Sequence, residues 1–237
     1  MSDHSLHESD LPDVHLSDVV QELEPLSGMS LWARMRLSYA DMRHTTRALI
    51  EERPSEARLL FFVLFSDLIF FLARGVQLVV SPSSAAQQSL PLEIGLWLIA
   101  VLLIRTLTLY IFSALVCVGG WAFGGTASWQ ATRTAVFWAS LVAAPVGVFG
   151  ALIGAGFAHL EPLYPIFAEP LLAWPPLLIG VVAFVYFLSA GVAEAHRFER
   201  TSNVFITFSV MTVVLLVTGL WLFARYGQAL VEAMRQI

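Results

Sequence analysis

The 237-residue chain contains no lysine, only one cysteine and few charged residues of either sign. Cys117 has no partner within the chain, so an internal disulfide and a zinc site built from several cysteines are both excluded. Charged residues make up 13% of the sequence, about half of the roughly 25% found in soluble domains. The net charge of −5 argues against a nucleic-acid partner, because nucleic acids bind basic surfaces.

Motifs that carry catalysis or cofactor binding are also missing. The sequence has no nucleophile elbow, no HExxH pair, no Walker loop and no paired catalytic glutamates. Gly124 and Gly125 follow no predicted strand and lack the GxGxxG and GKS/T patterns. We therefore interpret them as a turn between helices rather than a phosphate loop. The sequence predicts neither an enzyme nor a bound cofactor or metal.

Apolar residues, by contrast, are abundant: they make up 57% of the chain and raise its mean hydropathy to +0.74. They fall in five runs, at 59–80, 93–118, 134–157, 172–193 and 204–224. Each run has about the 20 residues that a helix needs to cross roughly 30 Å of hydrocarbon. A membrane barrel would instead show segments of about 10 residues with alternating polarity. The sequence thus predicts an all-α polytopic integral membrane protein with five transmembrane helices.

Arginine is distributed unevenly between the ends of these runs. The residues before the first run include Arg34, Arg36, Arg43, Arg47, Arg53 and Arg58. The connections 119–133 and 194–203 also contain arginine, whereas 81–92 and 158–171 contain none. Because positive side chains collect on cytosolic flanks, this alternation predicts a cytosolic N-terminus and an extracytosolic C-terminus. Only Arg225 and Arg235, after the last run, oppose this orientation.

The same pattern divides the chain into three regions. Residues 1–57 form a cytosolic acidic tail and juxtamembrane amphipathic region, 58–225 a five-helix membrane domain, and 226–237 a short extracytosolic tail. Within the first region, 28–50 has apolar residues at partly helical spacing, with arginines elsewhere. Two interpretations stay open for this segment. It is either a basic amphipathic helix on anionic lipid, or a short helix packed on the loops or a partly disordered linker.

Three ionisable residues fall within the predicted spans. Asp67, Arg74 and Arg105 would each cost roughly 2.5–3.5 kcal/mol at the centre of a membrane, so they need partners. At about 1.5 Å of rise per residue, Asp67 and Arg105 reach a similar depth in adjacent antiparallel helices, which predicts an ion pair. Arg74 lies nearer the outer surface and can extend toward it. We favour a structural pair that sets helix register over a proton or ion path.

Small residues are concentrated in the third run. Gly150 and Gly154 form a GxxxG motif, and Gly147 extends the same face. Such a face lets two helix backbones approach closely, and the partner helix belongs either to the same chain or to a second copy. Pro145 is expected to bend this helix.

Two segments beside the runs carry a family resemblance. One is Phe123-Gly124-Gly125-Thr126-Ala127-Ser128, and the other is Gly191-Val192-Ala193-Glu194-Ala195-His196-Arg197-Phe198. With five runs and a cytosolic N-terminal region, they make the chain resemble the Yip-domain family of membrane proteins, in particular its bacterial members. The resemblance covers residues 57–225 approximately. It implies five spans and termini on opposite sides of the membrane.

Eukaryotic members of this family act in early secretory traffic and associate with Rab-type GTPases. Their Asp-Leu-Tyr-Gly-Pro signature is absent here, so the resemblance does not imply a GTPase partner. It marks Gly124, Gly125, Glu194 and His196 as candidate functional positions in two cytosolic turns. His196 beside Glu194 would have a charge that responds near neutral pH, unless it is an ordinary solvated histidine in a turn.

These observations favour a non-catalytic scaffold or organiser of the bacterial inner membrane. Its expected partners are the lipid bilayer and other membrane proteins or a second copy of itself. The alternative is a small transporter or channel subunit that uses Asp67 and Arg105. The odd number of spans and the few polar residues within them count against this alternative. A membrane enzyme ranks last, because the sequence offers no nucleophile–base pair and no metal cluster.

Overall fold

The computed structural model describes residues 28–80, 95–96 and 98–235, and every regular element within these ranges is a helix. The predicted all-α fold is therefore confirmed. The acidic tail up to residue 27 lies outside the described residues. The elements in chain order are α2 (Leu31–Ala40), α3 (Met42–Glu51), α4 (Glu56–Val80), the π-helix η2 (Ala100–Arg105), α6 (Thr106–Ala122), α7 (Trp129–Leu160), the 3₁₀ helices η3 (Pro165–Ala168) and η4 (Pro170–Ala173), α8 (Trp174–Ala195) and α9 (Thr201–Arg235).

Four stretches of helix in the described part of the chain are long and apolar enough to cross a membrane. They are Leu102–Ala122, Trp129–Leu160, Trp174–Ala195 and Thr201–Gly227. The first predicted run, at 59–80, falls in α4, and α4 is not among these four candidate spans.

The connections predicted at 119–133 and 194–203 are wrong in length, since the structure has only 123–128 and 196–200 between these helices. The reason is that capping groups end a helix, not the last apolar residue. Ser128, for example, starts α7 by accepting a hydrogen bond from the Ala131 amide (3.1 Å).

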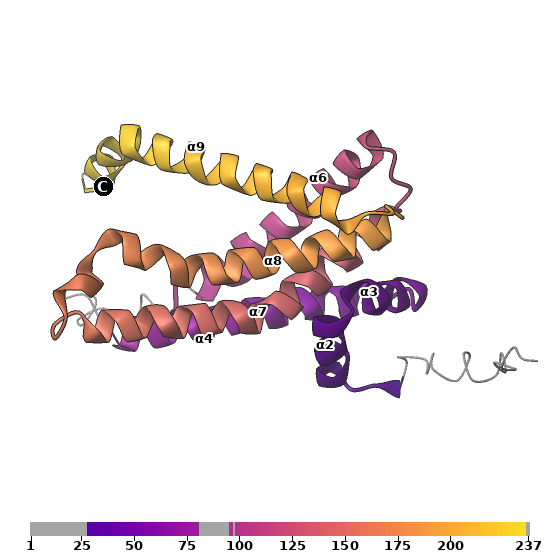
Figure 1. Ribbon diagram of the computed structural model, residues 1–237, viewed down its shortest axis with the longest axis horizontal. Helices are drawn as coiled ribbons and strands as arrows, with labels where there is room; N and C mark the ends of the chain where they lie inside the picture. The colour runs from indigo at the N-terminus through magenta and orange to yellow at the C-terminus, as the bar shows by residue number, and fades with distance from the viewer. Residues whose placement is uncertain (1–27, 81–94, 97, 236–237) are drawn as a thin grey trace, which may run out of the picture.

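α7 is the central helix of the bundle, and every residue from Ala131 to Ala144 is buried. A helix that is covered on all sides lies inside a bundle rather than at its surface. α4 and α8 pack along α7, and α3 and α6 also contact it (Figure 1). The rings of Phe62 on α4 and Trp138 on α7 lie 5.2 Å apart between centroids, at the centre of the apolar core.

The segment predicted as one amphipathic stretch consists of two short helices that meet at Asp41. This residue ends α2, and its side chain starts α3 by accepting from the His44 amide (2.9 Å). Figure 1 shows α2 crossing the direction of the long helices and α3 lying beside their ends. Met35, Met42 and Leu49 are buried in the core of the protein. The apolar face of these helices therefore packs on protein.

The long helix α7 continues through Pro145. The hydroxyl group of Tyr39 on α2 donates to the Val142 carbonyl (2.7 Å), three residues before this proline. A proline disturbs the helical hydrogen bonds of the preceding turn. This hydrogen bond thus joins α2 to α7 in the turn of α7 where Pro145 weakens the helical hydrogen bonds.

α9 is the outermost helix, and it lies against α8 (Figure 1). Large apolar side chains from Ile206 to Tyr226 are exposed along most of its length. These side chains face the surroundings of the bundle, which in a membrane are lipid chains.

Candidate functional site

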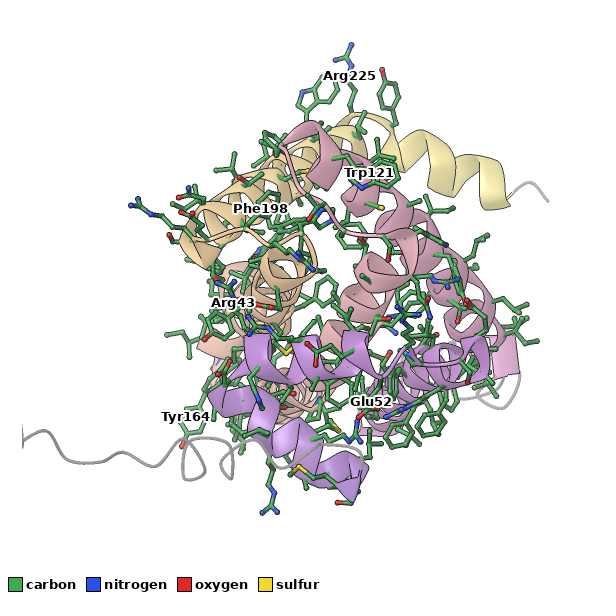
Figure 2. All side chains as sticks on the ribbon, turned by 90° about the vertical axis from the view of Figure 1, so that its right-hand side faces the viewer. Arg43, Glu52, Trp121, Tyr164, Phe198 and Arg225 are labelled. Carbon is green, nitrogen blue, oxygen red and sulfur yellow. The ribbon has the colours of Figure 1, made fainter. Side chains whose placement is uncertain are left out.

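A network of ion pairs and hydrogen bonds lies at the end of the bundle formed by α2, α3 and the connections 123–128 and 196–200. We call this region the arginine-rich end, the connection 123–128 the glycine turn, and 196–200 the histidine turn. Figure 2 looks onto this end, where Arg43, Phe198 and Trp121 are labelled.

The histidine turn follows a Schellman motif that ends α8. The Phe198 amide donates to the Ala193 carbonyl (2.8 Å), and the Arg197 amide donates to the Glu194 carbonyl (3.2 Å). Arg197 adopts a left-handed conformation with φ of 61°, a position that glycine or asparagine usually occupies. The motif reverses the chain, and α9 starts at Thr201.

The glycine turn uses the same motif to end α6. The Gly125 amide donates to the Gly120 carbonyl (2.8 Å), and the Gly124 amide donates to the Trp121 carbonyl (3.0 Å). Gly124 is the left-handed residue, with φ of 83°. The indole of Trp121 donates to the Ala127 carbonyl (2.8 Å) and closes the turn. The predicted turn between helices is therefore present and is held by these three hydrogen bonds.

The two turns interlock through the side chain of His196. Its ring lies so close to the glycine turn that a β-carbon on Gly120 would be 2.1 Å from Cε1, and one on Gly125 would be 2.3 Å from Nδ1. The Thr126 amide also donates to the His196 carbonyl (3.3 Å). Only residues without a side chain leave room for the imidazole at these two positions. The structure thus brings Gly120, Gly124, Gly125 and His196 into one unit.

The imidazole of His196 is buried, with 1% of the residue exposed, so the alternative of a solvated turn histidine is wrong. Its Nε2 lies 3.3 Å from the hydroxyl oxygen of Thr132 on α7. The hydroxyl oxygen of Thr132 also lies 3.2 Å from the Ser128 carbonyl oxygen, to which it can donate its hydrogen. Nδ1 has no hydrogen-bond partner among the described residues. Burial lowers the pKa of His196, because the charged form loses its hydration.

Glu194 fastens the histidine turn to α3. Arg43 donates to its Oε2 (2.9 Å) and Arg47 to its Oε1 (2.6 Å), and the glutamate side chain is only 8% exposed. Arg43 also donates to the carbonyls of Phe198 (3.1 Å) and Glu199 (3.2 Å). The hydrogen bond that Arg47 donates to Glu194 raises the pKa of Arg47 above its ordinary value. The guanidinium of Arg43 therefore caps the turn as well as neutralising the carboxylate.

The other end of α3 is fastened in a similar way. Glu52, its C-terminal cap, accepts from Arg34 of α2 (2.8 Å) and from Arg58 of α4 (2.7 Å). Gln130 at the start of α7 donates to the Pro54 carbonyl (3.2 Å). Figure 2 shows Arg43 and Glu52 at the two ends of this helix. α3 is thus a short strap across the bundle, held by one partly buried carboxylate at each end.

Asp67 and Arg105 form an ion pair within the bundle, and Asp67 is fully buried. Arg105 also donates to the hydroxyl groups of Ser66 (3.1 Å) and Ser140 (2.9 Å), while Thr106 donates to Asp67 (2.8 Å). Three helices, α4, α6 and α7, together with η2, supply this cluster. Arg105 ends η2, and π-helical turns of this kind re-aim a side chain out of the regular helical pattern.

The guanidinium carbon of Arg105 lies 4.3 Å from the centroid of the Phe70 ring. This cation–π contact adds an aromatic face to the hydroxyl partners of the arginine. The side chain of Arg74, the third ionisable residue, lies outside the described residues.

The glycine face of α7 contacts α8 of the same chain. A β-carbon on Gly180 of α8 would lie 3.0 Å from the Cα of Gly147, and one on Gly150 would lie 2.3 Å from the Pro176 carbonyl oxygen. Gly154 lines a cavity together with these residues. Close backbone approach is therefore the use of Gly147 and Gly150 within this chain.

The described residues contain no group of three or more histidine, cysteine or carboxylate side chains that could hold a metal ion. Many of their buried polar groups form helix caps, ion pairs and hydroxyl contacts between helices. This fold and these contacts define a helical protein of the membrane whose polar residues join helices.

The chain belongs to the Yip1 domain family, which matches residues 38–223. The match starts within α2, so that α3 and its two fastening points are part of the domain. Neither the curated proteins nor the solved structures give a significant match to this chain. As a family member with four long apolar helices in the part of the chain that the structure describes, the protein is a multi-pass membrane protein in contact with the lipid bilayer.

Proposed function

We propose that this chain is a non-catalytic organiser of the bacterial inner membrane that holds partner membrane proteins at its arginine-rich end. The observation that carries the proposal is the way α3 is fastened at both ends, by Glu194 and by Glu52. Ion pairs and caps are used there to hold a surface in one shape. A preformed surface lowers the ordering cost of binding a partner.

Exposed aromatic side chains at this end supply contact area. Trp32 on α2 is 60% exposed and Phe123 at the tip of the glycine turn is 76% exposed. Aromatic residues of this kind are enriched among the energetically dominant residues of protein interfaces. Arg36 on α2, and Arg197 and Arg200 in the histidine turn, lie at the same end and can contact acidic partner groups or anionic headgroups.

We also infer five spans, with α4 as the first. α4 has 25 residues, about 37 Å of helix, against roughly 30 Å of hydrocarbon. Leu60, Leu64, Leu68 and Leu72 are exposed at intervals of four residues, as expected for a stripe that faces lipid. Five spans put the termini on opposite sides, and the arginine distribution puts the N-terminus in the cytosol.

Partner binding is tested by quantitative affinity capture from native membranes in mild detergent. We compare the wild-type chain with Trp32→Ser, with Phe123→Ser and with Leu163→Ser, a control at a residue 71% exposed near the opposite end of the bundle. Proteins captured by the wild type and by the control, but lost with Phe123→Ser or Trp32→Ser, support the proposal. A chain that always purifies alone would contradict it.

The orientation is tested by fusing alkaline phosphatase or a green fluorescent protein to each terminus. We expect phosphatase activity only from the C-terminal fusion and fluorescence only from the N-terminal one. The same reporter active at both ends would exclude an odd number of spans.

A further inference from the structure

An apolar cavity of about 690 Å³ lies between α4, α6, α7, α8 and α9. This volume falls within the roughly 300–1,000 Å³ typical of small-ligand sites. Among the described residues that line it, Thr212 alone has a hydroxyl, amide or charged side chain, so a polar ligand would lose its hydration there without compensation. The cavity therefore suits a hydrocarbon.

Glycines form one wall of the cavity and aromatic rings form others. Gly147, Gly150 and Gly154 of α7 and Gly180 of α8 expose helix backbone to it, so the wall has few projecting side chains. The rings come from Phe70, Phe112, Phe184 and Phe208, on four different helices. A smooth backbone wall facing flat rings leaves a space suited to a flexible chain of methylene groups.

The cavity lies at membrane depth and opens at the side of the bundle. Its α9 residues, from Phe208 to Leu215, lie about 10–21 Å along the helix from Thr201. Leu177 is 58% exposed, Met211 44% and Leu215 63%, which places its rim at the outer surface. At this depth the surrounding medium is the hydrocarbon of the bilayer.

The position of α9 favours a lipid chain over a helix of another protein. α9 already packs against α8 and forms one wall of the cavity, so a further helix would have to displace it. We propose that the cavity binds one acyl chain of a bilayer lipid, inserted laterally between α9 and the wall formed by α7 and α8.

The experiment uses the full-length protein in vesicles of phosphatidylethanolamine and phosphatidylglycerol. A small share of the phosphatidylethanolamine carries a photoactivatable diazirine midway along one acyl chain. After illumination, the labelled residues are mapped by mass spectrometry. We expect labelling concentrated on cavity residues such as Val181 and Met211, above that of Val213, which is 58% exposed on α9 but does not line the cavity.

Two variants fill the cavity, and a third is a matched control. Met211→Trp and Val181→Trp should lower labelling of the remaining cavity residues about tenfold, the change expected when contacts of about two methylene groups are lost. Val213→Trp, the same substitution on the outer face of α9, should leave the labelling unchanged. Thermal unfolding of each variant shows that the bundle is intact.

The wild-type labelling map tests the proposal even where a variant fails to fold. Labelling spread evenly over Val213 and the cavity residues would overturn it, as would unchanged labelling in both cavity variants. Cavity labelling by a sterol or isoprenoid probe, with none by the phospholipid, would also overturn it. None of these outcomes depends on partner capture at the arginine-rich end.

Discussion

Gly120 and His196 are in such close contact that a β-carbon on the glycine would lie 2.1 Å from Cε1 of the imidazole. Because residue 120 has no side chain, the last turn of α6 can pack against the histidine turn. This contact joins the C-terminal end of α6 to the histidine turn.

Replacing Gly120 should weaken the contact between α6 and the histidine turn. We expect Gly120→Ala to lower the free energy of unfolding by about 1–3 kcal/mol, the usual cost of overpacking a core. Gly119→Ala is the matched control, since a β-carbon there meets nothing within 4 Å, and it should stabilise α6 by up to about 1 kcal/mol. Thermal and denaturant unfolding in detergent measure both. Equal effects of the two substitutions would show that the contact is not structural.

The left-handed residues of the two Schellman motifs should respond in opposite directions. Gly124→Ala forces a β-carbon into a φ of 83° and should cost about 1–2 kcal/mol. Arg197 already has a φ of 61°, so Arg197→Gly should raise stability by about 0.5–1 kcal/mol, after the loss to unfolded-chain entropy. The same unfolding assay gives both signs. A stabilising Gly124→Ala would refute this assignment of the turn.

His196 should make stability depend on pH. Because the folded protein holds the neutral imidazole, the proton binds better to the unfolded chain, whose histidine has its ordinary pKa of about 6.5. Stability from this residue is thus complete above pH 6.5 and falls as the pH decreases below that value. His196→Gln cannot titrate and should show a smaller decrease in melting temperature between pH 8 and pH 5. Parallel pH profiles of the two proteins would contradict the buried neutral histidine.

Arg43 and Arg47 should contribute unequally although both contact Glu194. Arg43 also donates to two carbonyls of the histidine turn and is 34% exposed, whereas Arg47 is 61% exposed. We expect Arg43→Gln to cost about 1–3 kcal/mol and Arg47→Gln about 1 kcal/mol or less. Thermal and denaturant unfolding in detergent measure both costs. A larger loss of stability in Arg47→Gln than in Arg43→Gln would reverse this ranking.

The Asp67–Arg105 pair should show strong coupling. Asp67→Asn and Arg105→Gln each leave a buried charge without its partner, and each should cost about 3–5 kcal/mol. The double variant should cost clearly less than the sum of the two. Additive costs would rule out energetic coupling. Ion flux in vesicles, measured on the same variants, provides the test of a transport role, because flux that is lost in Asp67→Asn would favour a channel or transporter.

The Asp67–Arg105 pair shows what could be predicted from the sequence and what could not. Counting helical rise predicts that these residues lie at one depth, and the structure contains the pair. The hydroxyl groups of Ser66 and Ser140 that complete the cluster carry no such signal. The hydropathy of serine is close to neutral, so the hydropathy pattern does not indicate which serines are buried. Their contact with Arg105 depends on how each helix is rotated about its axis.

His196 shows where sequence reasoning fails. A histidine just after an apolar run has the pattern of a solvated turn residue, and nothing in its neighbours indicates burial. Its burial depends on Gly120 in α6 and on Gly125 in the glycine turn, both far from His196 in the sequence. The arginines before α4 are a similar case: their number indicated orientation, but their pairing with Glu194 and Glu52 required the folded arrangement.

Hydropathy is a property of each residue and sums along the chain, so the sequence alone determined that long helices form and that hydrocarbon surrounds them. Helix ends and pairings far apart in sequence were decided by tertiary structure, because they depend on the rotation and spacing of packed helices. Gly120 and Gly125 leave room for the imidazole of His196, and this role exists only in the folded arrangement that brings the ends of α6 and α8 together.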